Sequence, residues 1–160
     1  MSHKNKDTVD YQKALDYSLR LLTLRDRSES DIRDRLFKKG YNDKTVDMVI
    51  ERLNLLGYLN EDRLLGRLLK VALEEKNYGR YGIKQFLISK GIRKELISNL
   101  SIPEDEYIRS AICFVNKKRK LLKSKDDTEN KKRLSQMLIR RGHDNDTIKK
   151  VLGVEGILYG

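Results

Sequence analysis

Apolar residues recur along the chain at spacings of three and four, the pattern of helices that bury one face. The first stripe begins near Thr8 and continues through Tyr11, Ala14, Leu15 and Leu22. Short polar segments containing Ser, Asn or Asp separate the stripes, and these residues cap the starts of helices. The alternation of a half-buried strand is rare. The chain is therefore predicted to be all-α.

One short pattern, a helical stripe that ends in glycine, occurs three times. Its glycines are Gly40, Gly91 and Gly142, which lie 51 residues apart each time. A register kept this strictly is typical of tandem repeats. Glycine ends a helix readily because it adopts the left-handed conformation at little cost. We expect three three-helix repeats between two flexible tails, and the predicted ranges are 1–7 (tail), 8–58, 60–101, 103–152 and 153–160 (tail).

Several helix boundaries can be predicted from local residues. Ser28 caps the second helix, and Asn42 or Asp43 caps the third. Segment 77–82 is expected to be a loop between helices.

In the last repeat, Pro103 is expected at the first helical position. The stripe of its first helix includes Ile112 as a buried residue, and Asp127 or Thr128 is expected to cap the next helix. Asp144 or Asn145 opens the last one.

Composition favours an extended array over a single globule. Only 38% of residues are hydrophobic and 37% are charged, which is lean for one deep core but suits small bundles with much surface. The lone Cys113 lies in an apolar segment, so packing is the expected role and a disulfide within the chain is excluded. With no apolar leader and no long apolar run, we expect a soluble, cytoplasmic protein without membrane contact.

The net charge of +11 predicts a polyanionic partner. Basic residues become more frequent toward the third repeat, which holds the run from Lys117 to Lys120 and the pair Arg140 and Arg141. Like charges within one helical turn repel each other, so the run is better explained by a phosphate or an acidic protein surface than by stability.

Catalytic chemistry has little support. His3 and His143 are far apart in sequence and have no companions at metal-ligand spacing. The carboxylates cluster at predicted helix starts, where capping and the helix dipole explain them. The segment from Gly79 to Gly82 lacks the preceding strand and the following Lys-Ser/Thr of a P-loop. We expect no enzyme, no metal and no cofactor.

Taken together, the motifs resemble those of the RecX regulatory proteins. The resemblance covers residues 11–152 and departs from the family at Leu64, often Phe, and at His143, usually an aromatic residue. The matching elements are Arg25-x-Arg27-Ser28-Glu29, Leu36-x-x-Lys39-Gly40, Leu59-x-Glu61-Asp62-x-Leu64, Gly79-Arg80-Tyr81-Gly82-Ile83, Leu87-x-x-Lys90-Gly91-Ile92 and Arg140-Arg141-Gly142.

This resemblance implies a curved, elongated array of right-angled three-helix bundles that modulates the RecA recombinase. RecX-like proteins lie as monomers in the groove of the RecA filament on single-stranded DNA. They limit strand exchange, ATP hydrolysis and repressor cleavage, and they carry no catalytic centre.

The candidate contact residues are cations and one tyrosine that could meet phosphate, a base or an acidic protein face. Packing tyrosines and surface ion pairs remain alternative explanations for several of them. The candidates are Arg25, Arg27, Arg80, Tyr81, Lys84, Lys90, Lys117, Lys118, Arg119, Lys120, Lys132, Arg133, Arg140 and Arg141.

Three other functions are alternatives. A nucleic-acid-binding module that needs no RecA would explain the charge, and an adaptor that binds only proteins would not need it. Helix-turn-helix reading of duplex DNA is disfavoured, because two of the three candidate reading helices begin with acidic residues, at 42–44 and 144–146.

Overall fold

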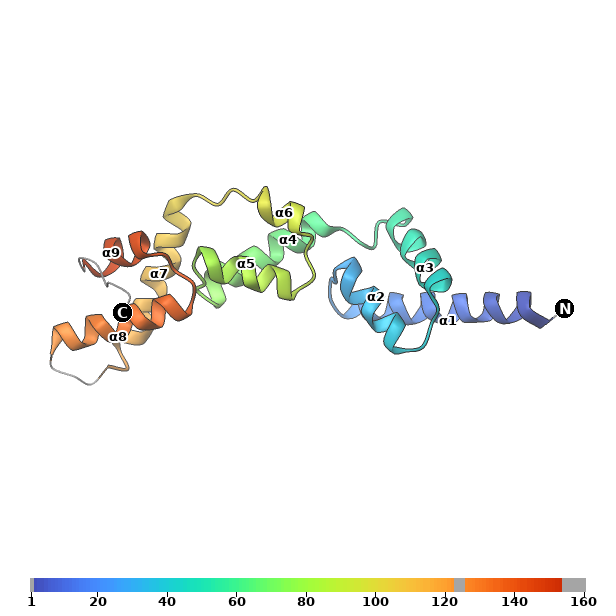
Figure 1. The fold of residues 1–160 in the computed structure, drawn as a ribbon, viewed down its shortest axis with the longest axis horizontal. Coiled ribbons are helices and arrows are strands. Elements are labelled where there is room, and N and C mark those ends of the chain that lie inside the picture. The colour runs from blue at the N-terminus through green and yellow to red at the C-terminus, as the bar shows by residue number, and fades with distance from the viewer. Residues whose placement is uncertain (1, 123–125, 154–160) are drawn as a thin grey trace. The chain divides into compact units, whose positions relative to one another are not determined.

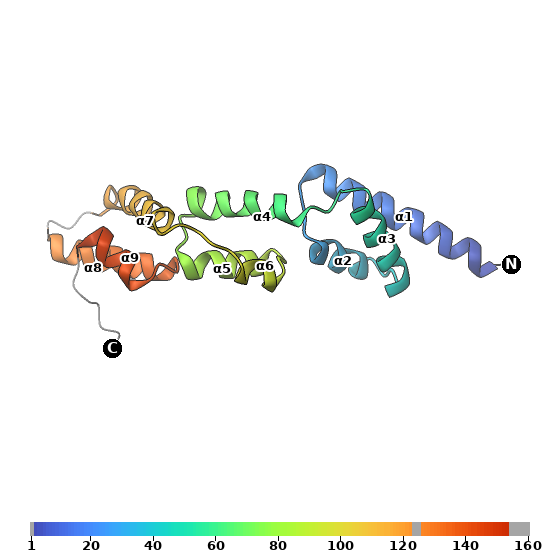
Figure 2. The same cartoon turned by 90° about the horizontal axis from the view of Figure 1, so that it is seen from above.

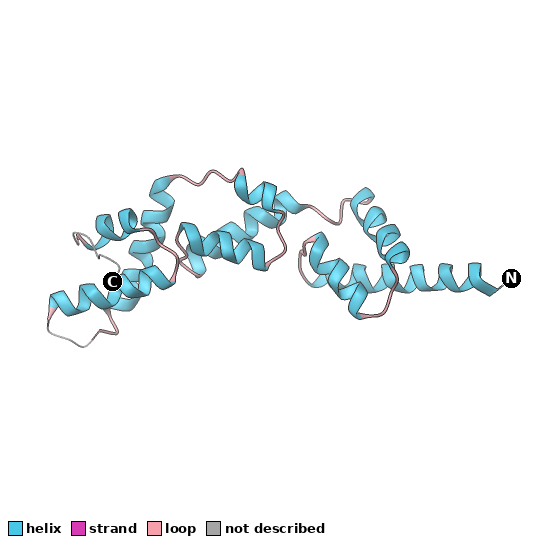
Figure 3. Cartoon of the chain, in the orientation of Figure 1, coloured by secondary structure: helices cyan, strands magenta, loops and turns pink. Residues whose placement is uncertain are grey.

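The computed structural model describes residues 2–122 and 126–153, with side chains from Thr8 onward. Every regular element in these ranges is helical, which confirms the all-α prediction (Figure 3). In chain order the elements are α1 (Ser2–Leu24), α2 (Glu29–Lys38), α3 (Asp43–Leu55), α4 (Glu61–Lys70), the π-helical turn η1 (Val71–Glu75), α5 (Arg80–Ser89), α6 (Lys94–Ser98), α7 (Glu104–Arg119), α8 (Asp127–Arg140) and α9 (Asn145–Leu152).

The chain divides into two compact units. The first contains residues 1–66 and the turn 90–92, and the second contains 67–89 and 93–160. Most of the predicted second repeat therefore shares a unit with the third. The boundaries of three separate repeats stay a prediction, and of the expected C-terminal tail only Gly153 falls within the described residues.

The core of the first unit is formed by α1, α2 and α3 (Figure 1). Its most deeply buried residues include Ala14, Leu36 and Leu53. The predicted caps are confirmed: Ser28 accepts from the Asp31 N–H at 3.1 Å and Asn42 from the Thr45 N–H at 2.8 Å. The predicted start near Thr8 is too late, because α1 begins at Ser2.

In the second unit, α7, α8 and α9 pack together in both views (Figures 1 and 2). The predicted stripe of α7 was wrong at one position: Ile112 is 44% exposed, and Phe114 is buried in its place. Two boundaries also move by one residue, since Pro103 is the N-cap of α7 rather than its first helical residue, and Asp126 caps α8. The core residues here are Ala111, Phe114, Val115, Leu134, Leu138, Ile148 and Leu152.

Candidate nucleic-acid interface

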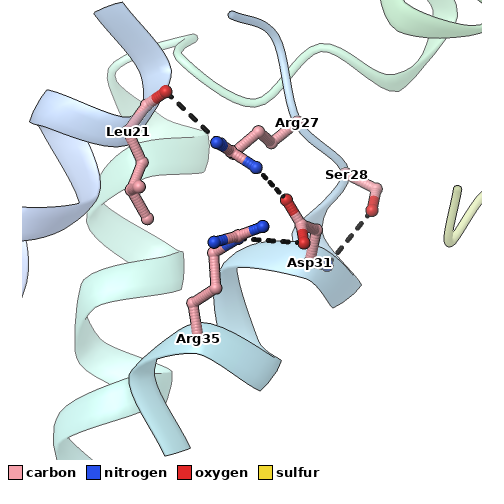
Figure 4. Close-up of polar contacts among 5 residues, drawn as sticks. All are labelled: Leu21, Arg27, Ser28, Asp31 and Arg35. Atoms are coloured by element: carbon pink, nitrogen blue, oxygen red, sulfur yellow. Dashed lines mark hydrogen bonds and ion pairs between the residues drawn. The ribbon is translucent and has the colours of Figure 1, made fainter. Parts of the chain in front are cut away.

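Arg27, a candidate contact in the first unit, is largely buried in a polar network (Figure 4). Its side chain is only 7% exposed and bonds to Asp31 at 2.6 Å and to the Leu21 carbonyl oxygen at 3.3 Å. Arg35 approaches the same carboxylate at 3.0 Å. Burial alone would raise the pKa of Asp31, but the hydrogen bonds from the two arginines outweigh it and hold that pKa below its usual value. Arg27 therefore ties the end of α1 to the start of α2.

The segment from Asn77 to Gly82 meets the turn after α8 through the backbone. The Gly79 N–H donates to the Arg141 carbonyl at 3.0 Å, and the Tyr81 N–H donates to the Gly142 carbonyl at 2.9 Å. The predicted loop was wrong in part, because α5 already begins at Arg80. Two segments distant in sequence are thus joined by backbone hydrogen bonds.

Arg80 occupies the first turn of α5 and turns toward acidic residues of the second unit. Its guanidinium lies 2.8 Å from Glu104 and 3.4 Å from Asp144, and 4.4 Å from the ring centre of Tyr107. Burial raises the pKa of Tyr107. The Arg80 side chain is still 40% exposed, so part of it remains accessible to solvent despite these internal ion pairs.

Two further cations of the basic third repeat also serve the fold. Arg141 stands over the rings of Tyr78 and Phe114, at 5.6 and 5.0 Å from their centres, and donates to the Lys76 carbonyl. Lys117 donates to the Asn77 side-chain oxygen at 2.9 Å.

The neighbouring candidates have local partners as well. Lys118 stands 5.8 Å from the centre of the Phe114 ring. Arg133 pairs with Glu129, one helical turn earlier on α8. Lys117 and Arg133 remain exposed despite these contacts, whereas Lys118 is half-buried.

Asn77 and His143 support the joint, that is, the contact between segment 77–82 and the turn after α8. The sequence did not single them out for that role. Asn77 is buried, has a left-handed φ of 52°, and donates from its amide to the Leu73 carbonyl at 2.9 Å. The His143 Nε2 lies 3.1 Å from the Asn77 carbonyl, while Nδ1 is buried with no partner. Burial lowers the pKa of His143. The only sequence signal was an asparagine between a helix and glycine.

The remaining candidates are exposed side chains on several elements: Arg25, Lys84, Lys90, Arg119, Lys120, Lys132 and Arg140. One of them, Arg140 of α8, lines the same part of the second unit as Tyr81 of α5. Both line a groove of about 400 Å³ within the second unit, together with Tyr78, Gln85, Phe86 and Ile139. The rings of Tyr78 and Phe86 lie 5.8 Å apart and are tilted by 49°. Aromatic faces beside a guanidinium suit stacking and phosphate pairing.

Residues 2–122 and 126–153 offer no metal site and no membrane-spanning helix. No group of three or more His, Cys, Asp or Glu side chains there is placed to hold a metal ion. Within the same ranges, no helix is both long enough and apolar enough to span a bilayer.

Comparison with known proteins gives consistent matches. The family profiles "RecX, first three-helix domain" and "RecX, third three-helix domain" match residues 14–53 and 105–152. A protein of Legionella pneumophila (strain Corby) named "Regulatory protein RecX" is 33% identical over 140 residues, covering 87% of this chain and 92% of the relative. One of the same name from Prosthecochloris aestuarii is 29% identical over 144 residues, covering 89% of this chain and 93% of the relative. The crystal structure of RecX from Lactobacillus salivarius has the same fold, with a TM-score of 0.77 at 18% identity, covering 91% of this chain and 96% of that one.

Proposed function

Because the chain belongs to the RecX family of regulatory proteins, we propose that it regulates the RecA recombinase. It binds as a monomer in the groove of the RecA filament on single-stranded DNA and limits strand exchange, ATP hydrolysis and repressor cleavage. It acts in the cytoplasm by binding alone, with no catalytic step and no cofactor.

The observation that supports this proposal beyond the family name is a set of exposed cations in the second unit. Arg119, Lys120 and Lys132 are all exposed there, on a chain whose net charge is +11. Exposed cations of this kind pair with DNA phosphates and release counterions. Contacts that reach neighbouring RecA subunits at once strengthen binding by multivalency. Binding in the groove would obstruct the path of the second DNA strand.

Strand exchange and repressor cleavage by RecA, measured with the full chain at substoichiometric amounts, test the proposal. We expect inhibition that weakens as salt rises, because phosphate contacts are screened. The triple variant Arg119→Glu, Lys120→Glu and Lys132→Glu should lose most of it.

A matched control reverses three exposed cations of the first unit, Lys38→Glu, Lys44→Glu and Arg52→Glu. It changes the net charge by the same amount and should keep the inhibition. No inhibition by the wild-type chain would refute the proposal, and equal inhibition by the two triple variants would refute the assignment to these three cations.

The second candidate function is nucleic-acid binding that needs no RecA. It is favoured by the groove that Tyr81 and Arg140 both line. This alternative predicts tight binding to naked single-stranded DNA with a steep salt dependence. Weak binding to naked DNA combined with inhibition of RecA would exclude it.

A further inference from the structure

The groove between α5 and the end of α8 combines aromatic side chains with an arginine. We infer that it seats unstacked bases of a single-stranded nucleic acid, with Tyr81 as the stacking surface and Arg140 as the phosphate contact. The inference deepens the proposed function and rests on it for the biological setting. The binding event itself involves only this chain and the nucleic acid.

Tyr81 presents a large aromatic ring to solvent. The residue is 60% exposed although it lines the groove. Its backbone is anchored, since the Tyr81 N–H donates to the Gly142 carbonyl at 2.9 Å. The tilted pair of Tyr78 and Phe86 forms another part of the same lining. A base that stacks here meets an exposed aromatic ring on an anchored backbone.

The side chains that follow Tyr81 along the helix supply polar contacts. Tyr81, Gln85 and Ser89 are four residues apart, lie on one side of α5 and all line the groove. The exposed Gln85 amide can both donate and accept, as the edge of a base requires. The Ser89 hydroxyl donates to the Phe86 carbonyl at 2.6 Å and can still accept a hydrogen bond.

The charge of the groove lining favours a nucleic acid over other ligands. Of the described residues that line the groove, none is acidic and Arg140 alone is charged. The exposed Lys84 lies one helical turn from Tyr81 on α5. A guanidinium at the rim of an aromatic groove complements a phosphate joined to a stacked base. A basic partner segment would be repelled from the same place.

The test measures binding of the full chain to an oligothymidylate of about 16 nucleotides, which spans one stacking site. A second ligand is an abasic strand of equal length, which carries the phosphates without the bases. We expect Tyr81→Ala to weaken binding to the oligothymidylate by about 5- to 150-fold, the range for loss of one stacked base. Binding to the abasic strand should not change.

Two further variants separate the ring from the charge. Tyr81→Phe keeps the ring and should bind both strands like the wild type. Arg140→Gln should weaken binding to both strands and reduce the salt slope by about one. The matched control is Tyr58→Ala, which removes an exposed tyrosine of the first unit (47% exposed) and should have no effect.

Three outcomes would overturn the inference. One is equal affinity of the wild type and Tyr81→Ala for the oligothymidylate, and another is an equal loss on the abasic strand. The third is a loss seen only when RecA is present, which would assign the groove to a protein side chain. Because the oligonucleotide measurements contain no RecA, their result and the strand-exchange result can fail independently.

Discussion

Replacing Gly82 with alanine tests the backbone joint between the start of α5 and the turn after α8. A Cβ at this position would overlap the Arg141 carbonyl oxygen and come within 3.1 Å of the Tyr78 Cβ. The first obstacle is backbone, which cannot rotate away as a side chain could. Alanine at position 82 should therefore push α5 away from the 141–143 turn.

The expected cost combines three effects. Separation weakens the hydrogen bonds to the Arg141 and Gly142 carbonyls, now 3.0 and 2.9 Å long, each worth about 0.5–1.5 kcal/mol. Overpacking adds about 1–3 kcal/mol. The better helix propensity of alanine returns about 1 kcal/mol. We expect Gly82→Ala to lower the free energy of unfolding by about 1–5 kcal/mol.

Gly66→Ala is the matched control, because Gly66 is an exposed helical glycine whose added Cβ would meet nothing within 4 Å. It should stabilise the chain by up to about 1 kcal/mol. Urea unfolding can be followed by the helical circular dichroism signal. Relative to the wild type, the urea midpoint should be lower for Gly82→Ala and unchanged or higher for Gly66→Ala. Hydrogen exchange at the Tyr81 amide should also become faster in Gly82→Ala. Equal midpoints for the two variants would refute the argument.

The remaining predictions concern single residues. Arg27→Ala should lower the free energy of unfolding by about 1–3 kcal/mol, less than for a fully buried pair because Asp31 is 33% exposed. Arg33→Ala, which removes exposed pairs only, should cost under about 1 kcal/mol in the same urea titration. His143 has a pKa below its unfolded value, so stability should be full above about pH 6.5 and fall as the pH drops toward the folded pKa. The urea midpoints at pH 7.5 and 5.5 should therefore differ more for the wild type than for His143→Phe, and equal differences would contradict this. Asn77→Gly should keep the left-handed backbone and cost less than Asn77→Val, whose branched side chain resists a φ of 52°, as thermal melts of the two variants will show.

The helix pattern and most caps could be predicted because they depend on neighbouring residues. Ser28 and Asn42 cap helices through atoms three residues away, and that spacing is visible in the sequence. The burial of Phe114 instead of Ile112 was not predictable in this way. In α7, the neighbouring rows that contain Ile112 and Phe114 are both apolar. The packing of α8 and α9 against α7 decides which of the two rows is buried.

The candidate site was harder to predict, since it depends on contacts distant in sequence. Arg25 and Arg27 look alike in the sequence, yet only Arg27 reaches the Leu21 carbonyl and Asp31. Tyr81 and Arg140 could be proposed as contacts separately. Their shared groove appears only when α5 and α8 are brought together.

The glycines that end the middle helices suggest how such a chain can grow by tandem duplication. A Cβ on Gly40 would meet nothing within 4 Å, whereas one on Gly91 would lie 2.6 Å from the Ser28 hydroxyl and one on Gly142 would overlap Gly82. In each crowded case the glycine lies near the start of the middle helix one repeat earlier. The glycine turn and the start of the middle helix both belong to the same 51-residue segment. A duplicated segment would therefore fit against the preceding copy without new side chains. A substitution at Gly40 would then be tolerated in evolution more readily than the same change at Gly142.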